Sequence, residues 1–353
     1  RRRSEAILIR CGKAIVGGIL ESMKILICPV AANPLAFAYW LENLKTYLHL
    51  FDKVVVVVNG LYPREWERIY VNLLPEEDRK ISLAFNHGIM QHGSALEIGV
   101  GFSLDDNDVI MFTDDDCFVK EPEGMAEVLR SIESDQYDIT GVHSNGYSQR
   151  ILDKHEELHG NRLPGLWPIL FCSKRKWLKN RNLGGQGWDP GTIIDALGCS
   201  FDVHQAADTL QEASMNMIAE GASVNFFLDP KIHECTLNEH GTEWPRWAFH
   251  TGSSGQVMNV CIVNPDTFVP MGHDPASPAH DPRGGHNWDL LMKDQITKHL
   301  ALWQTWVETV GHLLPDDFMG QFNAGAGFYL DHLDPDENQI KAFKEAIKAA
   351  VKL

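Results

Sequence analysis

The stretch Asp108-Val109-Ile110-Met111-Phe112-Thr113-Asp114-Asp115-Asp116 places an apolar run directly before three consecutive carboxylates. A short apolar run bounded by polar residues is typical of a buried β-strand, here over 108–113. Ligands of open α/β sheets bind beyond the carboxyl ends of the strands, which is where this sequence puts the acidic triplet. The stretch therefore predicts a sheet and also the place of a site on it.

The segments on either side alternate between strand and helix patterns. Five consecutive valines, Val54 to Val58, end at Asn59-Gly60, which is typical of a central parallel strand buried on both faces. Strands are predicted over 24–30, 54–58, 81–85, 108–113, 138–142, 168–172 and 224–228. Helices are predicted over 34–50, 64–74, 94–102, 125–132, 189–197, 206–219, 288–313 and 336–352. The alternation predicts an α/β fold with a Rossmann-like, mostly parallel sheet flanked by helices.

Changes in residue composition and pattern along the 353 residues predict three regions. Residues 1–22 are interpreted as an N-terminal extension, because Met23 runs straight into the first strand pattern. Residues 23–270 carry the α/β pattern and form the predicted main domain. Residues 271–353 are predicted to be a loop rich in Pro, Gly, Asp and His, followed by a helical appendage.

Composition narrows the class of protein. A formal net charge of −17 disfavours nucleic acid as a partner, because the electrostatic field of a negatively charged protein repels a phosphate backbone. Seven scattered cysteines without a CxxC pair favour reduced thiols in an intracellular protein, and a cytoplasmic location is expected. No apolar stretch approaches the roughly 18 residues of a spanning helix, so no membrane span is predicted.

The acidic triplet has a specific chemistry. Three adjacent carboxylates repel one another, and a hard divalent cation such as Mn²⁺ or Mg²⁺ would relieve that repulsion. Alternate residues of an extended segment point to opposite sides, so Asp115 is expected to differ in role from its neighbours. We predict Asp116 as a metal ligand, and Asp114 as a ligand or a contact to a bound sugar or ribose. The alternative is a solvated turn in which an aspartate caps the next helix.

The order of motifs around the triplet resembles a known family. Asn86-His87-Gly88, Gly93-Ser94-Ala95 and Gly99 precede the strand and the triplet. This arrangement resembles the Asn-x-Gly helix and the Asp-x-Asp strand of GT-A type glycosyltransferases, close to the family 2 pattern. The resemblance covers roughly residues 23–255, and it implies a GT-A fold.

The resemblance also implies roles for later residues. Gly184 and Gly185 resemble the glycine-rich loop near the donor sugar, and Asp189 resembles the catalytic base of inverting members. His250 resembles a late histidine that joins the metal or the diphosphate. The family has an aspartate that contacts the nucleotide after its second strand, whereas this chain has Asn59, which puts the choice of nucleobase in question.

These residues have structural alternatives as well. Asp189 could simply cap a helix that begins at Pro190, and a lone histidine such as His250 is often structural. The basic run 174–176 could reach phosphates, although a solvated helix start is the simpler interpretation. The clusters of histidine and acidic residues over 155–159 and 273–289 contain side chains that can bind metals. The simpler interpretation is an exposed helical face for the first and a loop for the second.

The resemblance implies metal-dependent transfer of a sugar from a nucleotide-sugar, with a UDP-sugar expected, to an acceptor hydroxyl with inversion. The acceptor could be a glycan or a small molecule, and a modified DNA base is disfavoured by the acidic balance. One alternative is a sugar-nucleotide nucleotidyltransferase, although no glycine-rich phosphate loop follows the first strand. Another is a sugar- or metal-binding protein without catalysis.

Overall fold

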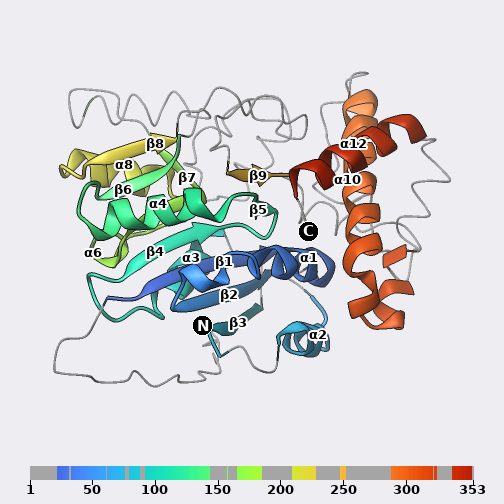
Figure 1. Ribbon diagram of the computed structural model, residues 1–353, viewed down its shortest axis with the longest axis horizontal. Coiled ribbons are helices and arrows are strands. Elements are labelled where there is room, and N and C mark those ends of the chain that lie inside the picture. Colours follow the sequence, from blue (N-terminus) through green and yellow to red (C-terminus); the bar gives the residue numbers. More distant parts are fainter. Residues whose placement is uncertain are drawn as a thin grey trace.

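A seven-stranded sheet with the order β3-β2-β1-β4-β7-β6-β8 forms the centre of the protein (Figure 1). The computed structural model describes residues 22–31, 33–60, 62–75, 79–87, 92–143, 157, 165–184, 209–227, 247–251, 288–320, 322–323 and 336–351. The strands of this sheet are β1 Lys24–Ala31, β2 Lys53–Gly60, β3 Ile81–His87, β4 Val109–Thr113, β6 Ile139–His143, β7 Leu166–Lys174 and β8 Val224–Phe227. A separate two-stranded sheet joins β5 Cys117–Val119 to β9 Ala248–His250.

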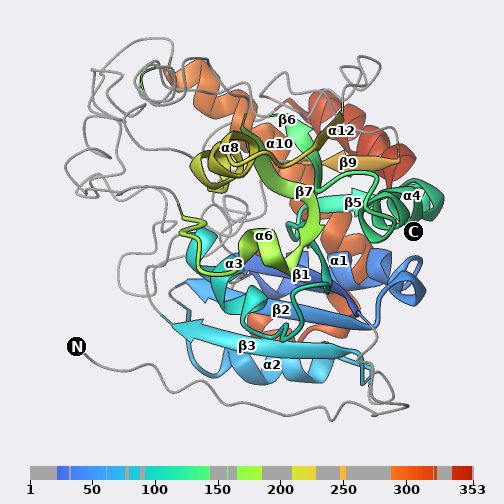
Figure 2. The same cartoon turned by 90° about the vertical axis from the view of Figure 1, so that its left-hand side faces the viewer.

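The large sheet is mostly parallel. β1, β2, β3 and β4 pair in parallel, and β6 pairs in parallel with β8. Only β7 among these strands runs in the opposite direction, between β4 and β6. Figure 2 shows the strands one above another, from β3 at the bottom to β6 near the top. The predicted Rossmann-like α/β class is therefore confirmed.

The inner strands β1, β2, β4 and β7 bury both of their faces, which explains the continuous apolar runs in their sequences. In β2, Val54, Val56 and Val58 join one hydrophobic cluster, while Val55 and Val57 join the cluster on the opposite face. All five valines are fully buried. This two-residue alternation is what a parallel strand covered by helices on both sides requires.

Helices cover the two faces unequally. The described helices are α1 Pro34–Leu44, α2 Trp66–Leu73, α3 His92–Val100, α4 Pro122–Glu133, α6 Arg175–Leu178, α8 Gln211–Ala219, α10 Trp288–Val310 and α12 Glu337–Ala350. Buried residues of α1, α2, α4, α10 and α12 belong to one hydrophobic cluster, and those of α3, α6 and α8 belong to the other. The helix predicted over 189–197 lies outside the described residues.

The first helix is shorter than predicted. The apolar spacing predicts a helix over 34–50, but α1 ends at Leu44 and a separate 3-10 turn, η1, spans Leu48–Leu50. The hydroxyl of Thr46 donates to the carbonyl of Asn43 at 2.8 Å, and such local bonds compete with helix continuation. Its start follows the usual chemistry, because Asn33 caps the helix and Pro34 takes the first position.

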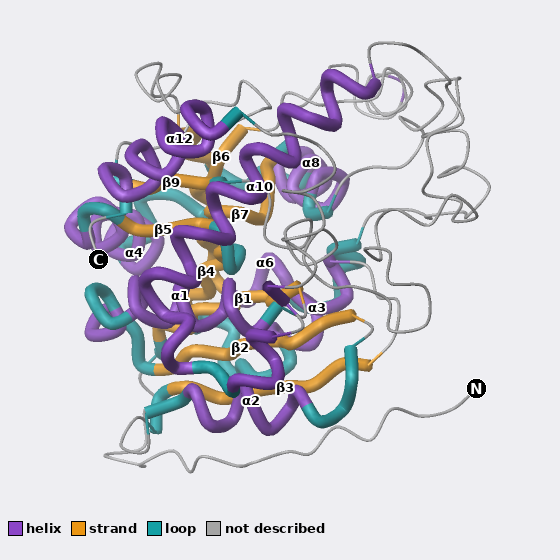
Figure 3. The backbone as a smooth tube through the Cα atoms, turned by 90° about the vertical axis from the view of Figure 1, so that its right-hand side faces the viewer, coloured by secondary structure: helices purple, strands orange, loops and turns teal. Residues whose placement is uncertain are grey.

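The C-terminal helices pack on the main body. α10 contacts α1 and α12, and Figures 1 and 3 show α10 and α12 together beyond α1. The rings of Trp306 and Tyr39 lie 6.2 Å apart between α10 and α1. In the part of the chain that the structure describes, no helix has the length and apolar character to cross a membrane. The predicted boundary near residue 271 lies outside the described residues.

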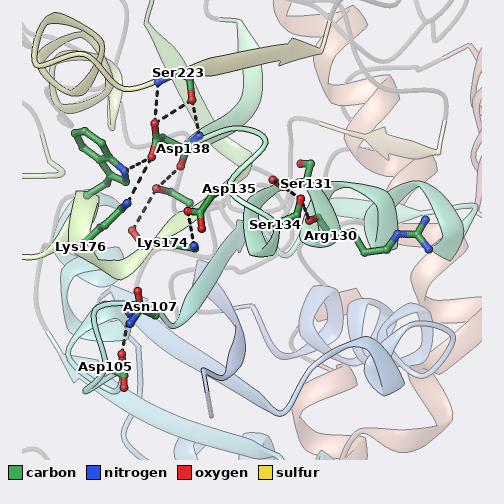
Figure 4. A network of polar contacts seen from close by, with 12 residues as sticks. Asp105, Asn107, Arg130, Ser131, Ser134, Asp135, Asp138, Lys174, Lys176 and Ser223 are labelled. Atoms are coloured by element: carbon green, nitrogen blue, oxygen red, sulfur yellow. Dashed lines mark hydrogen bonds and ion pairs between the residues drawn. The ribbon is translucent and has the colours of Figure 1, made fainter. Parts of the chain in front are cut away.

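A polar network holds the edge of the sheet beside β6 and β8. The carboxylate of Asp138 accepts bonds from the backbone N–H and hydroxyl of Ser223, at 3.1 and 2.9 Å, and from the indole of Trp177 at 2.9 Å. Figure 4 shows Asp138 between Ser223 and Lys176. Burial raises the pKa of Asp138, but these hydrogen bonds outweigh that effect and leave the pKa below its usual value.

Candidate metal centre

The order of strands creates a topological switch point where the acidic triplet lies. From β1 the chain builds β2 and β3 on one side, and it then returns to place β4 on the other side of β1. The helix that follows β1 lies on one face of the sheet, and the helix that leads into β4 lies on the opposite face. Ligands bind at such a switch point, outside the carboxyl ends of the strands. Asp114 follows β4 directly at this point.

Three side chains gather there. One ligand atom each from Asp114, Asp116 and His250 lies within 4.8 Å of the other two. Nε2 of His250 is 3.0 Å from Oδ1 of Asp116. Ligand atoms around an octahedral Mg²⁺ lie about 3–4 Å apart, so these side chains need to move little to hold a cation. The two carboxylates suit a hard divalent cation such as Mn²⁺ or Mg²⁺, and the imidazole favours a transition metal over Mg²⁺.

The small sheet brings His250 to the triplet from far along the chain. β5 follows the triplet, and it pairs antiparallel with β9 so that Cys117 lies opposite His250. The next residue, Thr251, donates its backbone N–H to the carbonyl of Asp116 at 3.0 Å. The imidazole therefore reaches the carboxylate through a backbone ladder rather than through a loose loop.

Burial strengthens the electrostatics of this cluster. The side chains of His250 and Asp116 are only 7% and 8% exposed. Burial alone lowers the pKa of His250, but the nearby charge of Asp116 and its hydrogen bond outweigh burial and raise the pKa above its usual value. Asp114 and Asp115 raise the pKa further. A cation at this place would satisfy the same negative charge that now attracts a proton.

Asp115 is not part of the three-residue cluster of possible metal ligands. It is buried at 3% exposure. Burial raises the pKa of Tyr70 well above its usual range, and the charge of Asp115 raises it further. The same two causes, in the same order, raise the pKa of Cys28. Tyr70 and Cys28 belong to the hydrophobic cluster that also contains α1 and α2. The charge of Asp115 therefore acts on groups on that face of the sheet.

His92 is a site residue that sequence reasoning missed. It is the first residue of α3, and its Nε2 lies 2.9 Å from Oδ1 of Asp114. The family pattern marks the residues around it, Asn86-His87-Gly88 and Gly93-Ser94-Ala95, but not this position. Its place at the start of the helix that leads into β4 is the signal that could have found it.

Asn59 is the next-to-last residue of β2 and lies opposite Ala31 at the end of β1. The side-chain amide of Asn86, at the end of β3, donates to Oδ1 of Asn59 at 3.0 Å. Gly60 follows with a φ of 130°, a conformation that side chains rarely adopt, so glycine is needed for the chain to leave the strand here. The two amides thus stand at the carboxyl ends of neighbouring parallel strands. The role of Asn59 toward a nucleotide stays a prediction.

Gly184 lies against the start of α3. A Cβ on Gly93 would come within 2.2 Å of the Cα of Gly184, so glycine at position 93 allows a backbone contact that a side chain there would block. The carboxylate of Glu97 also accepts the backbone N–H of Leu183 at 2.8 Å. Gly185 and Asp189 lie outside the described residues, so their predicted roles stay predictions.

The basic run 174–176 is at the opposite end of the sheet from the triplet. Lys174 pairs in register with Val109, at the start of β4, whereas the triplet follows the end of β4. Its three side chains form ion pairs with Asp135, Asp106 and Asp138. Helix α6 begins at Arg175, as the simpler interpretation predicts, but Lys174 ends β7 and is buried, so the prediction of a solvated run is wrong for this residue. Of the clusters at 155–159 and 273–289, only Glu157 and residues 288–289 lie within the described residues.

The chain matches no protein-family model and no curated protein. The mannosyltransferase PcManGT from Pyrobaculum calidifontis, in complex with GDP-Man and Mn²⁺, is similar with a TM-score of 0.39 and 13% identity over 94% of this chain and 76% of that chain. The galactosyltransferase LgtC has a TM-score of 0.38 and 11% identity over 65% and 87%. The cytidylyltransferase IspD of Francisella tularensis has a TM-score of 0.34 and 13% identity over 57% and 90%. Likenesses this distant carry no argument about activity.

Proposed function

We propose that this chain is a metal-dependent glycosyltransferase of the GT-A type that moves a sugar from a nucleotide-sugar, with a UDP-sugar as the first candidate, to an acceptor hydroxyl. One observation carries the proposal: Asp114, Asp116 and His250 gather at the topological switch point of the sheet. The resemblance of the motifs around β4 to the family supports it. Fold alone would not, because similar sheets serve many reactions.

In this proposal Asp114, Asp116 and His250 would hold a divalent cation beyond the end of β4. When bound, such a cation would supply positive charge that stabilises the diphosphate as a leaving group. Asn59, at the end of β2, contacts the nucleotide, and Gly184 lets backbone approach the donor sugar. Asp189 takes the proton of the acceptor hydroxyl, so that the attacking oxygen bonds to the sugar as the bond to the diphosphate breaks.

The hydrogen bonds at the start of α1 disfavour the alternative function of a sugar-nucleotide nucleotidyltransferase. Such an enzyme needs backbone N–H groups after its first strand to cradle a triphosphate. Here Oδ1 of Asn33 accepts the N–H groups of Leu35 and Ala36 at 3.2 Å, and Asn33 itself is fully buried. The carbonyl of Asn33 accepts the N–H of Phe37. The first turn of this helix thus has its donors already engaged by the protein.

The test measures nucleoside diphosphate released from UDP-, GDP- and dTDP-sugars, with Mn²⁺ and with EDTA. We expect release by the wild type with Mn²⁺ from one class of donor, and release by Asp116→Asn only at the level seen with EDTA. Asp106→Asn is the matched control, because Asp106 lies before the other end of β4 and pairs with Arg175. Pyrophosphate formed from a nucleoside triphosphate and a sugar phosphate, without diphosphate release, would overturn the proposal.

A further inference from the structure

We infer that His92 is a positioning residue that holds Asp114 in the orientation in which it shares a cation with Asp116 and His250. The inference deepens the proposed function, on which it rests, by adding a side chain from α3 to the metal centre. The 2.9 Å contact between Nε2 of His92 and Oδ1 of Asp114 is its starting point.

The direction of this hydrogen bond follows from chemistry. An ionised carboxylate can only accept hydrogen bonds, so Nε2 of His92 carries the hydrogen and donates it to Asp114. The placement of Nε2 separates His92 from the ligands. The ligand atoms of Asp114, Asp116 and His250 all lie within 4.8 Å of one another, and His92 is not part of that cluster. His92 is therefore a support for a ligand in this arrangement rather than a fourth ligand.

Asp114 needs such a support more than the other two members do. Its side chain is 19% exposed, compared with 8% for Asp116 and 7% for His250. His250 is paired in the ladder between β5 and β9, and the backbone of Asp116 is tied to the end of that ladder by the N–H of Thr251, whereas Asp114 lies two residues earlier, outside that pairing. Repulsion between the carboxylates of Asp114 and Asp116 favours rotation of the more exposed one away from the cluster. A hydrogen bond to His92 opposes that rotation.

The helix that presents His92 is itself held tightly. A Cβ on Gly99 would lie 2.3 Å from Cγ2 of Ile27, so α3 packs directly against β1. At its other end the contact of Gly93 with Gly184, and the bond from Leu183 to Glu97, fix the first turn. A support mounted on a rigid element can hold a ligand far more precisely than one on a loop. The same turn thereby links the metal centre to the start of the glycine-rich segment.

The experiment compares Mn²⁺ affinity among three variants by electron paramagnetic resonance of free Mn²⁺, with no donor present. We expect His92→Ala to raise the Kd for Mn²⁺ by about 10- to 100-fold, the usual effect of removing a side chain that orients a ligand. His92→Gln keeps an N–H donor at similar reach, and we expect it to recover most of the affinity. His49→Ala, at an exposed histidine of η1, is the matched control and should bind as the wild type does.

Each outcome bears on one statement. Equal Mn²⁺ affinity for His92→Ala and the wild type would overturn the positioning role of His92 and leave the proposed function intact. A loss in both His92→Ala and His92→Gln, with melting temperatures in EDTA well below that of the wild type, would also overturn it, because the histidine would then serve the fold. Tight Mn²⁺ binding by the wild type without release from any donor would instead overturn the proposed function and leave the positioning role standing.

Discussion

At the scale of single residues, His250 offers a test that depends on pH. Its pKa is raised in the folded protein, so the contact of the charged imidazole with Asp116 stabilises the metal-free fold at low pH and is lost as pH rises through the raised value. A cation needs the neutral imidazole. We therefore expect Mn²⁺ affinity to increase with pH between about 6 and 8, by up to about tenfold per pH unit, because one proton is displaced.

Isothermal titration with Mn²⁺ at several pH values would measure this trend. His250→Gln is the informative comparison, because glutamine keeps an oxygen and a nitrogen near Asp116 but does not titrate in this range. Its weaker binding should be nearly independent of pH. The same slope in the variant and in the wild type would show that another group supplies the proton and that His250 does not bind the cation.

Residues near the triplet differ in how far sequence predicts them. Asp114 and Asp116 are predicted from local pattern alone, because an apolar strand runs directly into them. His250 is distant in the chain and meets Asp116 only through the pairing of β5 and β9, so only the family resemblance could point to it. His92 is the first residue of α3 and precedes the helix predicted over 94–102, and no periodicity or charge pattern in the sequence indicates that its side chain reaches Asp114.

At the scale of elements, Asn43 joins α1 to β5, the strand that carries the triplet into the small sheet. Its amide donates to the carbonyl of Val119 at 2.9 Å, and its Oδ1 accepts the N–H of Val119 at 2.8 Å, all in a buried position. Asn43→Ala would leave two buried backbone groups without partners. We expect it to lower the free energy of unfolding by about 2–4 kcal/mol, measured by urea denaturation.

Tyr70 provides the matched comparison on α2. Its hydroxyl is also fully buried, but it has no hydrogen-bond partner among the described residues. Removing an unsatisfied group does no harm, so Tyr70→Phe should leave the free energy of unfolding unchanged or raise it by up to about 1 kcal/mol. A large loss from Tyr70→Phe, or none from Asn43→Ala, would contradict this assignment of satisfied and unsatisfied groups.

Elements were predictable to the extent that a local pattern determines them. The valines of β2 need no distant information, because a run of β-branched residues buried on both faces has few other solutions. The end of α1 shows the limit, since Asn43 and Thr46 carry helix-compatible spacing while their side chains bond to β5 and to the backbone. The small sheet could not be predicted, because its strands, Cys117–Val119 and Ala248–His250, are too short to show a pattern.

At the scale of the whole molecule, the described C-terminal helices share one core with the sheet. The sequence predicts residues 271–353 as an appendage. Whether such a region is a separate unit depends on whether its side chains pack into the core of the main domain. Trp306 of α10 is fully buried in the same cluster as Leu26 and Val56 of the sheet, and Phe318 meets Trp66 of α2 with ring centroids 5.0 Å apart. A cluster that spans both regions implies that they unfold together.

A destabilising change in α10 should therefore lower the stability of the whole described fold. We expect Trp306→Ala to lower the free energy of unfolding by about 3–5 kcal/mol, as for other large core residues, and to lower one cooperative transition seen alike by near-UV and far-UV circular dichroism. Glu345→Ala, at an exposed position of α12, should change it by less than about 0.5 kcal/mol. Trp306→Ala could instead unfold in two transitions. If the transition that Mn²⁺ stabilises then kept its wild-type midpoint, the helices would form a separate unit. A single lowered transition would mean that the cluster of Asp114, Asp116 and His250 depends for its stability on helices far along the chain, which the local sequence around the acidic triplet could not predict.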